Sequence, residues 1–536
     1  YGAGIFSIAS GMEVKGCSFT GLNYGVYFGI NGSKTYNASI IGSTFTSCLN
    51  GIVNLGRASV FINDNRFEMD DDIPTQSPAP QVGIYLYSSI LGQTIEQNAF
   101  VRSNEYSRYS IGVLAGYTGS YYNRINENTF TGLDMGTETY GKNGELIEKY
   151  VSGLTYTCNE FADITDYDFY IKYPNNGLYG MNPIQSNPGL LVTTPYHYGA
   201  QNIFSYSGFD MNRHDFDNKN VDKPIKYYFK TESGTRYEPY FFTPVGVEKI
   251  EINQTKACPT SSFFNKSYSE LSNEINTAKY ELDLIGIALE SETDSLIIDS
   301  LQKNAAYYSF VLQTSGADLI EVLDSNQAPL DTIIHWLDRI DLLGADLMIA
   351  ERLADAGLIT DAKDKLDDIL IGYDLTTEEE DDILELKDIY DLPEYNNPDS
   401  ISSININGLR SLIFHGPLTS GVARTILGIK GEFYDLPYFF VGDTILPRKS
   451  KVENNYKDIK LYPNPTSGVV TLIVEKENEH STIWIYDMFG NQLLRQKLNI
   501  GKNLINIDKS NTGIVIYNIF NEQGKMIKSG KLITIK

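Results

Sequence analysis

The chain has 536 residues, a formal net charge of −25 and 42% hydrophobic residues. Its length exceeds what one hydrophobic core supports, so we expect several domains. The composition is typical of folded domains rather than disorder, and the negative charge argues against a nucleic-acid partner, because phosphate binding needs a basic surface. No run of eighteen apolar residues occurs, so no membrane-spanning helix is expected.

Two sequence marks alternate over residues 1 to about 170, and the chain begins at Tyr1 inside this pattern. We therefore interpret the sequence as a fragment or a processed product. In the first mark a small polar residue or Asn precedes Phe, at Phe19, Phe45, Phe67, Phe100, Phe130 and Phe161. In the second mark Gly precedes a short apolar run, at Gly25, Gly51, Gly83, Gly112 and Gly153. Successive Phe residues of the first mark are 22 to 33 residues apart.

A repeat of this length, built from short strands and Gly/Asn turns, predicts a right-handed parallel β-helix. We expect Phe to stack on Phe inside the solenoid, Asn to bond from coil to coil, and Gly to supply left-handed turns. A β-sandwich, with a strand every 8–12 residues, is the alternative interpretation. Residues 171–258 keep the β character without the clean repeat, so residues 1–258 are predicted as a β-helix with capping strands.

The sequence contains four cysteines, Cys17, Cys48, Cys158 and Cys258. None lies in a CxxC motif, so no zinc site is predicted. Four cysteines allow three complete pairings, and the sequence alone does not select one. A disulfide between Cys158 and Cys258 is our preferred pairing, because these two cysteines bracket the capping segment.

Helical spacing of apolar residues begins near Lys266 and predicts an α-helical, solenoid-like domain over residues 266–430. After a first helix, the pattern predicts helices at about 293–313, 330–343, 345–356, 360–371 and 377–391. Thr376 and Thr377 precede an acidic run and are expected to cap the last of these. One hairpin resembles the small-residue core of a tetratricopeptide repeat, through Ala350, Leu353, Gly357, Ala362 and Leu366.

Charge separates the C-terminal part from the rest of the chain. Residues 351–399 hold 17 acids and 4 bases, whereas residues 448–536 hold 14 bases and 8 acids. Residues 431–457 are predicted as a linker, because they contain prolines and a basic cluster. Residues 458–536 alternate short apolar runs with turns, about seven strands in all, which predicts an immunoglobulin-like β-sandwich.

This last module resembles the type A C-terminal sorting domain of type IX secretion substrates of Bacteroidetes. The matching stretches are Tyr462–Gly468, Ile485–Gly490, Asn511–Ile516 and Lys531–Lys536. The residues of the sorting motif are Tyr462, Pro463, Asn464, Pro465, Gly468, Gly490, Gly513, Lys531 and Lys536. The family usually carries an aromatic residue soon after the position of Gly513, and this chain has Ile514 and Val515 there.

The resemblance implies export to the cell surface. Residues 458–536 would be recognised by the outer-membrane translocon and its shuttle protein, and a sortase-like surface protease would cut within residues 447–458. The preceding region is similar to large uncharacterised Bacteroidetes surface proteins, through Thr157–Phe161, Lys256–Pro259 and the acidic helices that follow. That similarity implies no activity for named residues.

Glu68, Asp70, Asp71 and Asp72 form the densest acidic cluster of the repeat region. With Arg57, Arg66 and Arg102 one coil away, these residues are candidates for binding calcium and a uronate, as a polysaccharide-active β-helix would require. The alternative is an acidic, solvated loop leading to Pro74, and it is favoured because no matching carboxylate recurs on neighbouring coils.

Other patterns give no catalytic site. Asp215, Asp217 and Asp222 fail the EF-hand pattern, because Lys219 stands where an oxygen ligand belongs and no Gly follows. A structural turn is the favoured interpretation of this segment. The five His residues are scattered, and no GxSxG, HExxH or Walker loop occurs. No catalytic residue, metal site or cofactor is therefore predicted, calcium being the one candidate ion.

Three functions remain open for the cargo. The first is an adhesin or binding protein whose Tyr-rich coils stack on glycans or on a host or other cell surface. The second is a β-helix polysaccharide lyase or hydrolase. The third is a structural stalk for an upstream domain. We expect a secreted, non-enzymatic binding protein.

Overall fold

The computed structural model divides into two compact units, Tyr1–Arg448 and Lys449–Lys536. The described residues are 2–8, 12–29, 38–56, 60–69, 79–87, 92–102, 108–119, 121–147, 150–172, 179–191, 193–205, 213–258, 266–373, 375–392, 395, 403–413, 415–432, 434, 460–462, 466, 469–474, 481–486, 492–507, 513–520 and 526–534. No helix in this described part combines the length and apolar character needed to cross a membrane.

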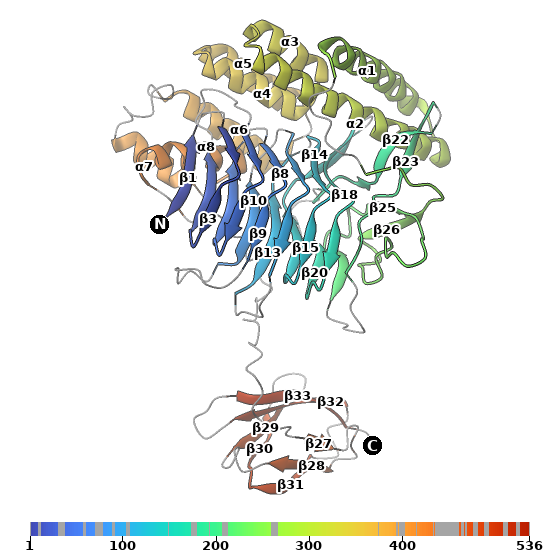
Figure 1. Cartoon of the computed structure of the whole chain (residues 1–536), viewed down its shortest axis with the longest axis vertical. Helices are drawn as coiled ribbons and strands as arrows, with labels where there is room; N and C mark the ends of the chain where they lie inside the picture. The colour runs from blue at the N-terminus through green and yellow to red at the C-terminus, as the bar shows by residue number, and fades with distance from the viewer. Residues whose placement is uncertain are drawn as a thin grey trace. The chain divides into compact units, whose positions relative to one another are not determined.

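Three large sheets form the β part of the first unit (Figure 1). The eight-stranded sheet has the order β1 (Ala3–Ile8), β4 (Tyr24–Gly29), β7 (Asn50–Leu55), β10 (Gln81–Tyr87), β13 (Ser110–Gly116), β16 (Met135–Tyr140), β20 (Tyr167–Ile171) and β24 (His214–Asn218). The seven-stranded sheet has the order β17 (Gly144–Ile147), β18 (Tyr150–Thr157), β14 (Asn123–Asn126), β11 (Thr94–Glu96), β8 (Val60–Asn63), β5 (Ala38–Ile41) and β2 (Met12–Lys15). The six-stranded sheet has the order β19 (Glu160–Ala162), β15 (Thr129–Thr131), β12 (Ala99–Val101), β9 (Arg66–Glu68), β6 (Thr44–Thr46) and β3 (Ser18–Thr20).

All neighbouring strands of these sheets are parallel except β17 and β18. Each turn of the chain adds one strand to each sheet in the same order, which is compatible with the predicted parallel β-helix. We call the three sheets the stack. Beyond it lie the parallel strands β21 (Ile184–Gln185), β25 (Ile225–Phe229) and β26 (Val247–Glu251), and the hairpin β22 (Asn187–Leu191) with β23 (Thr194–Tyr198).

The predicted Phe stack and Asn ladder are both confirmed. Rings from Phe19 to Phe161 stack in sequence with centroids 4.7–4.9 Å apart. An unbroken line of side-chain amide bonds, 2.9–3.0 Å long, joins Asn65, Asn98, Asn128, Asn159 and Asn202. Each Asn satisfies backbone and side-chain groups of its neighbours in a buried site, where an unpaired amide would be unfavourable.

Gly153 of the second mark has a positive φ, but other glycines of this mark have another role than the one predicted. Gly83 does not have a positive φ, so its backbone is not left-handed. A Cβ added to Gly83 would lie 2.5 Å from the ring of Phe100. The same clash recurs between Gly25 and Phe45, and between Gly112 and Phe130. The expectation of left-handed turns was therefore wrong at these positions, where Gly leaves room for a Phe ring.

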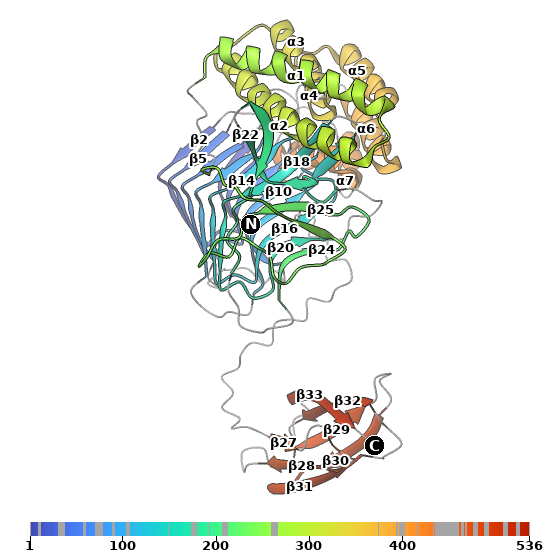
Figure 2. The same ribbon diagram turned by 90° about the vertical axis from the view of Figure 1, so that its right-hand side faces the viewer.

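Eight helices follow in the described part of the chain, and they lie along one side of the stack (Figures 1 and 2). They are α1 (Tyr268–Ser291), α2 (Ser295–Ser325), α3 (Leu330–Ile340), α4 (Leu343–Asp355), α5 (Ile359–Gly372), α6 (Thr377–Tyr390), α7 (Ser403–Leu412) and α8 (Pro417–Ile429). Thr376 caps α6 in a capping box with Glu379, which confirms the predicted N-terminus. The hairpin α4–α5 buries Ala350, Ala362 and Leu366, and its tetratricopeptide character stays a prediction.

The helices contact the stack directly, although the sequence suggested consecutive domains. Tyr121 Oη donates to the carbonyl of Gln313 on α2 at 3.2 Å, and the amide of Val151 donates to Ser309 Oγ at 3.3 Å. At the other end of the layer, Lys142 pairs with Glu379 at 2.9 Å. Residues 1–258 and 266–430 thus belong to one compact unit.

The second unit contains two antiparallel sheets around one apolar core. One sheet holds β27 (Lys460–Tyr462), β28 (Val469–Val474) and β31 (Gly501–Asn506). The other holds β30 (Gln492–Lys497), β29 (Thr482–Tyr486), β32 (Gly513–Phe520) and β33 (Met526–Thr534). Seven strands agree with the expected number, and the immunoglobulin-like assignment stays a prediction. Most of the predicted linker, 431–457, lies outside the described residues.

Candidate functional site

Of the predicted carbohydrate and calcium residues, the structure describes Glu68 and the arginines Arg66 and Arg102. Glu68 lies on β9, accepts from Thr46 Oγ1 at 3.0 Å and pairs with Arg66 at 2.8 Å. These bonds to Arg66 and Thr46 lower the pKa of its carboxyl. Asp70, Asp71, Asp72 and Arg57 lie outside the described residues. Within the described part, no group of three His, Cys, Asp or Glu side chains could hold a metal ion.

Arg102, the third arginine of that hypothesis, is not available to a ligand. Its guanidinium is buried and forms two bonds to the carboxylate of Asp134, at 2.5 and 3.2 Å. Asp134 also accepts from the amide and hydroxyl of Ser110. This buried pair joins two successive coils, so its role is to hold the stack together.

Asp215 and Asp217, expected in a turn, lie on β24 and are buried. Asp215 bonds to Arg236 and Asp217 bonds to Thr243, both on the segment that caps this end of the stack. Asp168 contacts Arg213 at 3.0 Å in the same region, and burial raises the pKa of Asp168 to about 7. These carboxylates serve ion pairs and hydrogen bonds inside the fold.

The tyrosines of the coils face inward against other parts of the chain. Tyr27, Tyr85, Tyr87 and Tyr140 are each at most 6% exposed, and Tyr85 and Tyr140 bond through their hydroxyls at 2.7 Å. Burial raises the pKa of Tyr27, Tyr87 and Tyr140. The expectation that coil tyrosines stack on sugars is thus wrong for these four, because their rings are covered.

An open groove of about 600 Å³ lies between the hairpin β22–β23 and the helices α1 and α2. This volume falls within the usual range for small-ligand sites. We call it the hairpin groove. Its lining comprises Pro188, Gly189, Leu190, Thr193, Lys256, Lys266, Asn273, Glu274, Thr277, Ala278, Tyr307, Tyr308, Phe310, Val311, Thr314 and Ser315.

The hairpin groove combines aromatic rings with hydroxyl groups. Tyr307 and Tyr308 are half-buried, with ring centroids 5.1 Å apart and ring planes at 69°. Burial raises the pKa of both phenols, so they stay neutral and can donate or accept hydrogen bonds at physiological pH. Half-buried rings beside polar side chains are typical of sites where one face of a ligand is apolar and its edge is polar.

Charge in the hairpin groove is unevenly paired. Lys266 contacts Glu274 at 2.8 Å, and Glu274 also accepts from Ser315 Oγ at 2.6 Å. Lys256 is different, because its ammonium forms one hydrogen bond among the described residues, to the carbonyl of Pro188 at 3.5 Å. Partial burial of this ammonium lowers its pKa.

A covalent bond fixes the segment that carries Lys256. The structure contains a disulfide between Cys158 and Cys258, with Cα atoms 6.0 Å apart, and this is the pair preferred from the sequence. The backbone next to it is held by side-chain amides: Gln201 donates to the carbonyl of Lys256 at 2.5 Å, and Asn187 donates to that of Ala257 at 3.2 Å. Cys17 and Cys48 are free.

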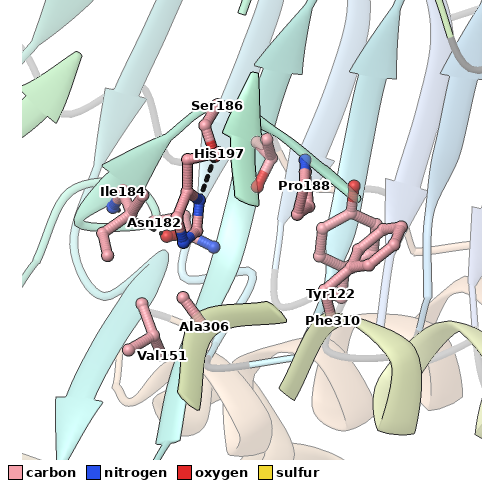
Figure 3. Close-up of a pocket in the computed structure, with 10 residues that line it drawn as sticks. Tyr122, Val151, Asn182, Ile184, Ser186, Pro188, His197, Ala306 and Phe310 are labelled. Atoms are coloured by element: carbon pink, nitrogen blue, oxygen red, sulfur yellow. Dashed lines mark hydrogen bonds between the residues drawn. The ribbon is translucent and has the colours of Figure 1, made fainter. Parts of the chain in front are cut away.

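A small cavity adjoins the groove and shares Pro188 and Phe310 with it (Figure 3). There Ser186 Oγ lies 2.8 Å from His197 Nδ1, and His197 Nε2 lies 2.8 Å from the carbonyl of Lys303 on α2. Because a carbonyl only accepts, Nε2 carries the hydrogen and Nδ1 accepts from Ser186. Burial lowers the pKa of His197 to about 4, so the ring is neutral at pH 7.

A serine bonded to a neutral histidine is one requirement of a nucleophilic site. This cavity has a volume of only about 10 Å³, the space of a single water, so no substrate fits beside Ser186. The pair instead links the residue before β22 to β23, and His197 links β23 to α2. This pair could not be predicted, because Ser186 and His197 match no motif and the backbone partner of His197 lies more than 100 residues away in the sequence.

The second unit carries the residues of the sorting motif. Tyr462 ends β27, Gly513 begins β32 and Lys531 lies within β33. Pro463, Asn464, Pro465, Gly468, Gly490 and Lys536 lie outside the described residues. Residues 460–535 match the family described as the secretion system C-terminal sorting domain. This sorting domain supports delivery to the cell surface by the type IX secretion system. No curated protein and no solved structure matches the chain.

Proposed function

We propose that the chain is a cell-surface binding protein that recognises glycans in the hairpin groove. The sorting domain supports its delivery, with the translocon and its shuttle protein binding residues 458–536 and a sortase-like protease acting in 447–458. One observation carries the binding proposal. The hairpin groove places two tyrosine rings beside hydroxyl and amide groups, in a volume suited to an oligosaccharide.

The parallel-sheet stack supports this role, because we propose that it is a β-helix acting as a rigid scaffold. Its end beyond β18 carries β22 and β23, which form one wall of the groove. We propose a non-catalytic cargo. Among the described residues, Glu274 is the single carboxylate that lines the groove, and it is already bonded to Lys266 and Ser315, whereas glycoside hydrolysis generally uses two.

Binding is tested with immobilised oligosaccharides and the full chain in solution. The panel contains trimers of galacturonate, mannuronate and glucuronate, their methyl esters, and neutral glucose and galactose trimers. The variant Tyr307→Ala, Tyr308→Ala removes both rings and should weaken binding at least tenfold. Tyr280→Ala is the matched control, because Tyr280 is 62% exposed on α1 and does not line the groove. No binding by the wild type, or equal binding by the double variant, would overturn the proposal.

The same samples test for catalysis. Trimers incubated with the full chain should stay intact, as measured by mass spectrometry and by the ultraviolet absorbance of unsaturated uronates. Accumulation of a shortened or unsaturated product would show that the cargo is a hydrolase or lyase.

Delivery is tested separately in the cell. Deletion of residues 459–536 should leave the protein in the periplasm, whereas the intact chain reaches the surface. Surface labelling of the truncated protein at the level of the intact one would refute the sorting role.

A further inference from the structure

We infer that the hairpin groove prefers a carboxylated oligosaccharide, that Lys256 binds its carboxylate, and that the Cys158–Cys258 disulfide positions Lys256 for this. The inference rests on the proposed glycan-binding function and names the ligand class. Neither the sorting domain nor the predicted acidic cluster at Glu68 bears on it.

The charge of the hairpin groove is complementary to a carboxylate. Three charged side chains line the groove, and two of them, Lys266 and Glu274, form a pair. Lys256 leaves one positive charge without a carboxylate partner among the described residues. An ammonium with free donors beside an apolar wall binds an ionised group more strongly than a hydroxyl, because charge-assisted hydrogen bonds are about twice as strong as neutral ones.

The ammonium of Lys256 and the rings of Tyr307 and Tyr308 come from different elements that line the hairpin groove. Lys256 Nζ lies over the hairpin, near Gly189 and the carbonyl of Pro188, while Tyr307 and Tyr308 come from α2 on the facing wall. A side chain at residue 189 would meet Lys256 Nζ at 3.1 Å, so Gly189 leaves space for the ammonium. The ammonium and both rings therefore line one groove, as simultaneous recognition of a sugar ring and its carboxylate requires.

The hydroxyl-rich lining favours a sugar over a peptide. Thr193, Asn273 and Thr277 offer both donors and acceptors, which match the hydroxyls around a sugar ring.

A disulfide and two hydrogen bonds hold the backbone segment that carries Lys256. Lys256 precedes Cys258 by two residues, in a segment after β26 that has no strand partner. The disulfide and the amides of Gln201 and Asn187 fix its backbone against the last coil and against β22. Reduction would release this segment, so carboxylate recognition should develop only after oxidation outside the cytoplasm.

The test compares each uronate trimer with its own methyl ester, which keeps the ring and removes the charge. The wild type should bind at least one acid about tenfold more tightly than its ester. Lys256→Gln should lose that preference while still binding the ester, and Lys256→Arg should retain most of it. Lys15→Gln is the charge-matched control, because Lys15 is exposed on β2 and does not line the groove.

The disulfide is tested with Cys158→Ser, Cys258→Ser. This double variant should bind the ester as the wild type does and lose the preference for the acid. Near-ultraviolet circular dichroism checks that each variant is folded.

Three outcomes separate the two proposals. If the wild type binds neutral trimers and esters as well as acids, or if Lys256→Gln keeps the acid preference, the carboxylate inference is wrong and the glycan proposal stands. If no trimer binds, the glycan proposal fails first. If acidic peptides bind and trimers do not, the groove is a peptide site and both are overturned.

Discussion

His197 should make the first unit lose stability as the pH falls below neutrality. The ring is 5% exposed, and burial lowers its pKa to about 4 from a usual value near 6.5. The unfolded chain thus binds a proton at a higher pH than the folded chain does. Stability from this group is fully present above pH 6.5, falls between pH 6.5 and 4, and levels off below pH 4. The shift corresponds to about 3 kcal/mol in the free energy of unfolding.

The variant His197→Gln isolates this effect, because Gln does not titrate. The wild type and the variant should differ most at pH 7.5, and the wild type's advantage should shrink by about 2.5 kcal/mol by pH 4.5. Comparison with a variant is needed because the pKa of buried Asp168, raised to about 7, gives the opposite dependence, with stability lost as the pH rises from about 4 to 7.

The assay is urea unfolding followed by tryptophan fluorescence. The chain has two tryptophans, Trp336 on α3 and Trp484 in the sorting domain. A Trp484→Phe background leaves Trp336 as the reporter of the helical layer that His197 helps to attach. If the two stability curves stay parallel within about 0.5 kcal/mol from pH 7.5 to 4.5, the assignment of a buried, neutral His197 is refuted.

Three further substitutions test the internal supports of the fold. Gly83→Ala should destabilise the first unit by about 2 kcal/mol, because the new Cβ meets the Phe100 ring, whereas Gly372→Ala, in open space, should change the unfolding midpoint little. Asn98→Ala interrupts the ladder and leaves buried backbone groups unpaired, so we expect a loss of about 3 kcal/mol in urea unfolding, and a loss under 1 kcal/mol would contradict the ladder's role. Thr376→Ala should cost about 1 kcal/mol through the lost cap of α6, and hydrogen exchange confined to the first turn of α6 would locate the effect.

The repeat could be predicted because each coil repeats the same local chemistry. An Asn and a Phe two residues apart recur in most coils, and such a recurrence is interpretable without knowing the rest of the fold. The role of Gly83 could not be deduced in this way. Its constraint comes from the ring of Phe100 on β12, a strand of a different sheet. A glycine considered in the sequence alone is equally typical of a turn.

The hairpin groove was beyond sequence reasoning for a related reason. Its walls come from residues near 188, 256, 274 and 307, and no local pattern links these segments. The bond from Tyr121 to Gln313 spans 192 residues, so the docking of α2 on the stack was equally hidden. Tyr307 and Tyr308 were visible only as part of a helical pattern, and Lys256 only as a neighbour of Cys258.

The Cys158–Cys258 disulfide has a mechanical consequence for a protein displayed on a cell. If the C-terminal end is attached to the surface and a force acts on the coils before Cys158, tension passes through the sulfur–sulfur bond. The intervening chain, residues 159–257, then carries none of the load along its backbone. The hairpin β22–β23, one wall of the groove, lies within this bypassed loop, so it would keep its shape while the rest of the chain is under shear.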